Sequence, residues 1–270
     1  MVELNKKYEI QFRKFGFINW IGFKSLWLKE CNRFMAVWQQ TLLSPLVSSL
    51  LFLSVLSLAL GNNRGDVLGH SFISFLAPGL IAMSILTQSF SHSVSSLMIA
   101  KIQGNIVDML YAPLSALEVS MAIILAAMTR GFLIAIISIF VFSLIVEVPI
   151  HNIFYIFIFG FLSSFMLGSL GFITGLWAEK FDHTATVTNF IITPLSFLSG
   201  VFYSIDKLPI VFQNISHVNP FFYMIDGFRY GFLGQSDGSI IFGVIYLVIL
   251  CFIMWFISFY LYKNGYKIKS

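Results

Sequence analysis

Four ionisable side chains lie in or beside apolar stretches of the chain, where their types and spacing could support chemistry. They are His92, Arg130, Asp226 and Arg229. A charge at the centre of a bilayer costs roughly 2.5–3.5 kcal/mol. Arg130 is therefore expected to face the bundle, to pair with a carboxylate, for which Glu118 and Asp108 are the candidates, or to reach an interface. The sequence favours a structural clamp at the cytosolic edge for Arg130 over contact with a substrate.

The spacing of Asp226 and Arg229 allows a direct interaction, because residues three apart share one face of a helix. We interpret them first as a structural ion pair and second as contacts of a gate. His92 lies in a run of hydroxyl-bearing residues, 87–96. A hydrogen-bonded packing residue is the favoured role there, ahead of a role in moving a proton or a ligand.

No catalytic motif accompanies these residues. The sequence contains no Gly-Lys pair, and therefore no phosphate-binding loop of the G-x-x-x-x-G-K-[ST] type. The five histidines are scattered, without zinc-ligand spacing, and neither H-E-x-x-H nor G-x-S-x-G occurs. The chain is therefore not expected to be an enzyme by itself, and no cofactor or metal is expected in it.

Composition places these residues in a polytopic membrane protein. Of 270 residues, 58% are hydrophobic and 10% are charged, against about 25% charged in soluble domains. The pattern predicts an all-α protein with six membrane-spanning helices and no nucleic-acid partner. The spans are expected over residues 37–60, 71–100, 119–146, 153–178, 185–203 and 240–262, with Pro194 as a kink in the fifth.

The segments outside the spans also have distinct patterns. Residues 1–16 form a basic tail, and Phe17–Met35 predicts an amphipathic helix at the membrane interface, with a helix packed on a neighbouring subunit as the alternative. Residues 101–118 form a polar break around a short exposed helix, 106–111. Within the fourth span, Ser164, Gly168, Gly171 and Gly175 form a stripe of small residues for close helix packing.

Two short helices are expected between the last two spans, too short to cross a bilayer and too apolar for a solvated loop. Asp206 is expected to cap the first, with Pro209 in its first turn. Asn219 is expected to cap the second, with Pro220 at its first position and Gly234 just past its end. We interpret the pair as re-entrant helices over a pathway.

Loop charges predict the orientation. Twelve Lys and Arg residues fall on the side of the two termini and three on the other. The positive-inside rule therefore predicts cytosolic N and C termini and an outer position for the re-entrant pair.

The segment that follows Thr193 resembles the C-terminal part of ABC-2 type permeases, the membrane subunits of one class of ATP-driven exporters. The resemblance rests on P-L-S-F-L-S-G-V-F-Y from Pro194, L-P at Leu208, and N-P-F-F-Y-M-I-D-G-F-R-Y-G-F-L-G from Asn219. Within the family, the sequence most resembles the YadH-like bacterial inner-membrane permeases, and the likeness extends over most of the chain. The substrate is not indicated.

The resemblance implies roles for three groups of residues. ATPase coupling is implied for Gly104, Asn105, Asp108, Leu110, Pro113 and Glu118, and a connector helix for Trp20, Phe23, Trp27, Lys29 and Arg33. An outer re-entrant gate is implied for Gly200, Pro209, Asn219, Pro220, Tyr223, Asp226 and Arg229.

It further implies a single transmembrane domain over 1–270, with a cytosolic tail and connector helix (1–36), a six-helix bundle (37–262) and a short cytosolic tail (263–270). The protein would lie in the bacterial inner membrane, contact lipid, and pair with a second copy of itself or a like permease. Separate ATPase subunits would bind ATP and magnesium. The alternatives are an ATPase-independent secondary transporter, a membrane enzyme acting on lipid, and a non-transporting scaffold.

Overall fold

The computed structural model describes residues 16, 18–60 and 65–268, and this part of the chain is helical, without a β-strand. Most of the predicted basic tail, and Phe17, lie outside the described residues. Five helices are long and apolar enough to cross a membrane: Gln39–Ala59, Phe72–Ile102, Ala116–Ser143, Ile153–Trp177 and Ile240–Lys263. They match five of the six predicted spans.

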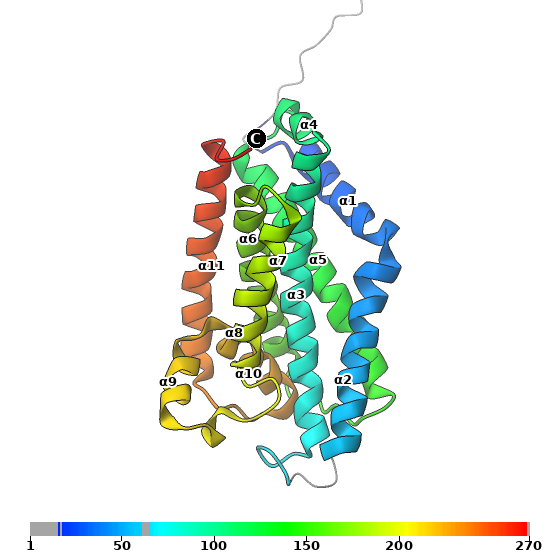
Figure 1. The fold of residues 1–270 in the computed structure, drawn as a ribbon, viewed down its shortest axis with the longest axis vertical. Coiled ribbons are helices and arrows are strands. Elements are labelled where there is room, and N and C mark those ends of the chain that lie inside the picture. The colour runs from blue at the N-terminus through cyan, green and yellow to red at the C-terminus, as the bar shows by residue number, and fades with distance from the viewer. Residues whose placement is uncertain (1–15, 17, 61–64, 269–270) are drawn as a thin grey trace, which may run out of the picture.

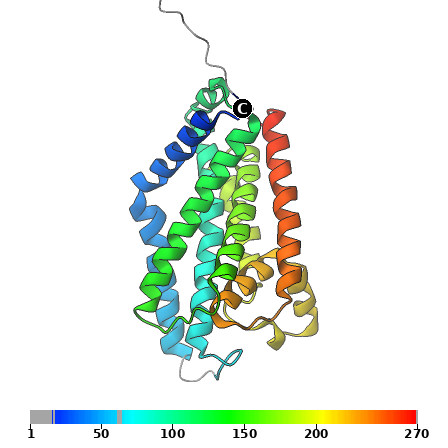
Figure 2. The same ribbon diagram turned by 180° about the vertical axis from the view of Figure 1, so that it is seen from behind.

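The bundle is built around α3 (Phe72–Ile102), α5 (Ala116–Ser143) and α6 (Ile153–Trp177). Helix α11 (Ile240–Lys263) packs on α6 at one side, and α2 (Ser44–Leu60) lies beside α3 at the other (Figure 1). Helix α1 (Trp20–Ala36) crosses obliquely at the end of the bundle that also holds α4 (Ile106–Tyr111) and the C-terminal end of α11 (Figure 2).

The predicted stripe of small residues lets α6 approach its neighbours closely. A Cβ added to Gly171 would lie 2.4 Å from the carbonyl oxygen of Phe90 on α3. A Cβ on Gly168 would lie 3.3 Å from the Cβ of Ala127 on α5. Glycine is needed where backbones pack this closely, so the predicted packing role of the stripe is confirmed.

The sixth predicted span, 185–203, is not among the five long helices. Its region forms a shorter helical segment made of α7 (Phe181–Val187), the π-helix η2 (Thr188–Ile192) and α8 (Thr193–Phe197). Pro194 lies in the first turn of α8, directly after η2, and the ring of a proline disturbs the helical hydrogen bonds of the preceding turn. The predicted irregularity at Pro194 is therefore present as a π-helical turn.

Two further helices, α9 (Ile210–Val218) and α10 (Pro220–Leu233), lie at the end of the bundle opposite α4 (Figure 1). The capping of α10 is as predicted: the Asn219 side chain accepts from the Phe221 N–H, Pro220 is the first residue, and Gly234 follows with φ +70°. The predicted cap of α9 is wrong. Asp206 lies in the 3₁₀ turn η3 (Ile205–Lys207), and Pro209 itself occupies the N-cap position.

Candidate functional site: a polar groove beside α3

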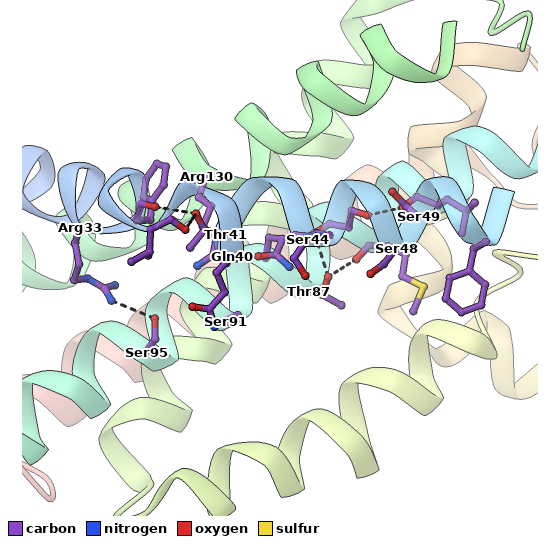
Figure 3. Close-up of a pocket in the computed structure, with 18 of the residues that line it drawn as sticks. Arg33, Gln40, Thr41, Ser44, Ser48, Ser49, Thr87, Ser91, Ser95 and Arg130 are labelled. Atoms are coloured by element: carbon purple, nitrogen blue, oxygen red, sulfur yellow. Dashed lines mark hydrogen bonds between the residues drawn. The ribbon is translucent and has the colours of Figure 1, made fainter. Parts of the chain in front are cut away.

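A cavity of about 780 Å³ lies between α2 and α3 and contains hydroxyl and amide groups within the apolar bundle. From α2 and the π-helix η1 (Gln39–Leu43) that precedes it come Gln40, Ser44 and Ser48. These residues are spaced by four, so they share one helix face. Figure 3 shows them turned toward the side chains of α3.

The facing wall is the polar run of α3. Thr87, Ser91 and Ser95 also recur every four residues, and Gln88 lies beside them. Ser91 is exposed although it lies well inside a membrane-length helix. A hydroxyl left open at this depth suits close packing against another helix or contact with water better than contact with lipid tails.

A second cavity of about 400 Å³ lies on the other side of the same run. It shares Thr87, Gln88, Ser91 and Ser95 with the first cavity and continues to Thr184 of α7 and Thr188 of η2. We call the two cavities together the polar groove: α3 forms its floor, and α2 and α7–η2 form its walls. The stripe at positions 40, 44 and 48 was missed at the sequence level, although its four-residue spacing in an apolar span was a readable signal.

Arg130 of α5 also lines the groove, and its predicted partners are wrong. Its terminal NH2 group donates to Oε1 of Gln88. Glu118 instead accepts from the backbone N–H groups of Asn19 and Ser115, and Asp108 lies on α4 with an exposed side chain. The cause is the capping box of α5, which uses Glu118 at the helix start.

A buried cluster of charged and polar groups joins α1 to α3 at the α1 end of the groove. Glu30 accepts from Nε of Arg33 at 2.9 Å and from Oγ of Ser96 at 2.8 Å. His92 is fully buried and packs edge-on against Phe34, with ring centroids 5.5 Å apart. Its packing role is thus confirmed, but neither ring nitrogen has a hydrogen-bond partner among the described residues.

Two of the residues for which the resemblance implies ATPase coupling, Pro113 and Glu118, contact the start of α1. Nδ2 of Asn19, the N-cap of α1, donates to the carbonyl oxygen of Pro113 at 3.0 Å, and its backbone N–H binds Glu118. These contacts form a joint that links α1, the segment after α4, and the start of α5. Gly104 adopts φ +76° in the turn before α4, and Asn105 and Leu110 are exposed.

The connector residues differ in their surroundings. Trp20 and Lys29 are exposed, whereas Phe23 is half-buried. Nε1 of Trp27 donates to Oγ1 of Thr129 on α5 at 3.2 Å, and Arg33 reaches the groove. The exposed side chains of α4 include Val107, Leu110 and Tyr111, a set that leaves an apolar face open at this end.

At the opposite end, the predicted ion pair between Asp226 and Arg229 is not formed. Asp226 accepts from the backbone N–H groups of Asp237 and Gly238, each at 3.0 Å. Arg229 donates to the carbonyl oxygens of Gly200 and Val201, at 2.7 and 3.4 Å. Each side chain satisfies backbone groups of a neighbouring loop, and α10 thereby holds the segments on either side of it. We call this arrangement the α10 junction.

Other residues of this end support the α10 junction. Asp237, which the sequence did not single out, accepts from Oγ of Ser204 at 2.7 Å and from the N–H of Ile205 at 3.0 Å. Tyr223 is buried and packs against Tyr246 of α11, with ring centroids 5.5 Å apart. Pro209 is exposed.

The α10 junction predicts a pH dependence of stability. Burial raises the pKa of Asp226 to about 6, above the value of about 4 of a free carboxyl group. Protonated Asp226 is thus favoured in the fold, and stability is lost as pH rises from about 4 through about 6. Thermal melting in detergent from pH 4 to 8 should show this slope in the wild type and not in Asp226→Asn. Equal slopes in the two proteins would contradict the assignment.

The five long helices and the polar groove together define a multi-pass membrane transport permease. The chain belongs to the ABC-2 type transporter family, whose pattern it matches over residues 22–233. It is 35% identical over 253 residues to the inner membrane transport permease YadH of Escherichia coli K12, covering 93% of this chain and 98% of that protein. It is also 26% identical over 240 residues to nodulation protein J of Rhizobium leguminosarum bv. viciae, covering 83% of this chain and 88% of that protein.

Proposed function

We propose that this chain is the membrane subunit of an ATP-driven exporter in the bacterial inner membrane. It forms a single domain of six spans, the fifth being the segment of α7, η2 and α8, with both termini in the cytosol. Two copies, or this chain and a like permease, enclose a substrate pathway that includes the polar groove. Separate ATPase subunits bind ATP with magnesium and drive the cycle.

The observation that carries the proposal is the continuous connection between the joint at Glu118 and the groove. A partner pressing on α4 moves the segment that Asn19 and Glu118 tie to α1. Helix α1 leads, through Arg33 and η1, directly into the α2 wall of the groove. Displacement at the cytosolic end is therefore transmitted to the groove by packed helices.

The outer end would act as the gate in this proposal. Helix α10 is buried at every residue except Pro220 and Tyr230, and α9 exposes most of its apolar residues. A buried helix attached to two loops by Asp226 and Arg229 can shift as a unit when those contacts rearrange. The proposed re-entrant pair then opens the pathway outward.

The test uses candidate ABC ATPase subunits from the same organism. Serine at Val107, Leu110 and Tyr111 together removes the exposed apolar face of α4 but keeps the buried Ile106 and Met109. We expect this triple variant to lose co-purification with the ATPase, or to lose stimulation of ATP turnover in lipid vesicles. A short helix that binds in a groove of a partner does so mainly through its apolar side chains, so their removal should weaken the complex.

The matched control replaces Gln103 by serine, which alters an exposed polar side chain of the same loop that is not among the coupling residues. It should bind and stimulate the ATPase as the wild type does. If no ATPase associates with the wild-type chain and the triple variant behaves normally, the exporter proposal fails, and an ATPase-independent secondary transporter becomes the leading function.

A further inference from the structure

The two arginines of the polar groove differ in charge balance. Arg33 is neutralised by Glu30, its partner at 2.9 Å. Arg130 forms no ion pair within the described part of the chain, and it is only 7% exposed. The groove therefore contains one buried cation without a counter-charge of its own.

The hydrogen bonding of Arg130 is also incomplete. Its NH2 group donates to Gln88, but its buried Nε–H has no acceptor among the described residues. A guanidinium presents five donors in a planar fork that matches oxyanions. The Nε atom is itself covered by protein atoms, but the Arg130 side chain lines a cavity of about 780 Å³, within the size range of small-molecule sites.

Of the two carboxylates that the sequence offered for Arg130, Asp108 is exposed on α4 and Glu118 is held elsewhere. Glu118 binds two backbone N–H groups at the start of α5, and Glu30, which lies close to the groove, is also engaged, by Arg33 and by a serine of α3. An isolated cation at this depth is unfavourable by several kcal/mol. A bound anion would remove that penalty, so the unbalanced charge itself favours an anionic ligand.

We infer that Arg130 binds an oxyanion, a phosphate or carboxylate, of the molecule that occupies the groove. The hydroxyl and amide stripes of α2 and α3 then bind a polar, hydrogen-bonding body attached to that oxyanion (Figure 3). This inference rests on the proposed function only in calling the occupant the substrate. Anion binding at Arg130 does not require ATP.

The test measures binding of dodecyl phosphate by calorimetry to the full chain in nanodiscs of phosphatidylcholine. We expect saturable binding that Arg130→Gln weakens at least about tenfold, the effect of losing one charge-assisted hydrogen bond. Arg130→Lys, which keeps the charge, should retain affinity within a few-fold. Neutral dodecyl maltoside should compete poorly.

The matched control is the double variant Glu179→Gln with Lys267→Gln, which removes an exposed ion pair outside the groove and leaves the net charge unchanged. It should bind dodecyl phosphate within about threefold of the wild type, because the pair contributes no net charge. If Arg130→Gln fails to fold, the double variant Ser44→Val with Ser91→Val is measured instead. It should weaken the binding of dodecyl phosphate without abolishing it. Unchanged affinity in Arg130→Gln, or no binding to the wild type, overturns the inference.

Two further arms identify the source of the anion. Competition by inorganic phosphate assigns the site to the phosphate group itself, whereas competition by phosphatidylglycerol added to the nanodiscs assigns it to a lipid headgroup. Both support an oxyanion site. If the wild-type chain binds dodecyl phosphate but stimulates no ATPase, the exporter proposal fails and this inference stands. If it stimulates an ATPase but binds no dodecyl phosphate, only this inference fails.

Discussion

Gly171→Ala is expected to lower the melting temperature and the yield of folded protein, because this position has no room for a side-chain carbon. The added Cβ would lie 2.4 Å from the Phe90 carbonyl oxygen and 3.1 Å from the Cβ of Ser93, both on α3. The nearest atom belongs to the backbone of a long helix, which cannot rotate away as a side chain can. Overpacking of this kind destabilises by about 1–3 kcal/mol and often more, out of a total stability of about 5–15 kcal/mol.

The matched control is Gly160→Ala in the same helix. There the Cβ would lie 3.4 Å from the nearest atom, Cε1 of Phe132, a flexible side chain in ordinary contact. Alanine is favoured over glycine in a helix by about 1 kcal/mol, so this variant should be neutral or slightly more stable. Monodisperse yield and thermal melting in detergent measure both variants. Equal melting temperatures would show that α3 and α6 are not packed as described.

A change in the contact between Gly171 and Phe90 would also change the width of the polar groove, because α3 forms the floor of the groove. Substitution at Gly171 displaces α3 relative to α6, and Ser91 and Ser95 move with it. Any Gly171→Ala protein that does fold should therefore bind groove ligands less well. The fold and the site share one helix in this protein, so they cannot be varied independently at this position.

Much of the fold followed from local patterns in the sequence. Hydropathy located five long helices, and the spacing of Gly168, Gly171 and Gly175 identified the close face of α6. The caps of α10 were also readable, because Asn219, Pro220 and Gly234 act through their own backbone geometry. Signals of this kind do not depend on which helices are neighbours.

The partners of the buried charges could not be read in the same way. Glu118 lies on the same helix as Arg130, about 18 Å away along its axis and too far for an ion pair. That Arg130 meets Gln88 depends on the depth and rotation of α3 against α5, which no local pattern specifies. Asp226 and Arg229 are correctly spaced for an ion pair, yet loop backbones on either side of α10 provide better partners. Spacing within one helix gives possible contacts, and tertiary packing selects among them.

Arg229→Met is expected to destabilise the α10 junction strongly. The guanidinium is 1% exposed, lies 3.8 Å from the ring centroid of Phe75, and donates to the carbonyl oxygens of Gly200 and Val201. Methionine would fill part of the space but leave both carbonyl oxygens without this donor. Asp226 would also lose the nearby positive charge. Hydrogen bonds that involve a charged group contribute about 1.5–3 kcal/mol each, so the loss of both is a large effect for a single substitution.

Amide hydrogen exchange shows which residues lose protection when Arg229 is replaced. We expect the amides of residues 198–208 to exchange faster in Arg229→Met, because Arg229 is the contact that fixes Gly200 and Val201 to α10. Lys207→Met removes an exposed cation from the same region and should change stability by no more than about 0.5 kcal/mol. If both variants melt alike and residues 198–208 stay protected, then Arg229 does not hold the end of α8 against α10. Faster exchange in Arg229→Met alone would identify these hydrogen bonds as the ones that hold residues 198–208 against α10.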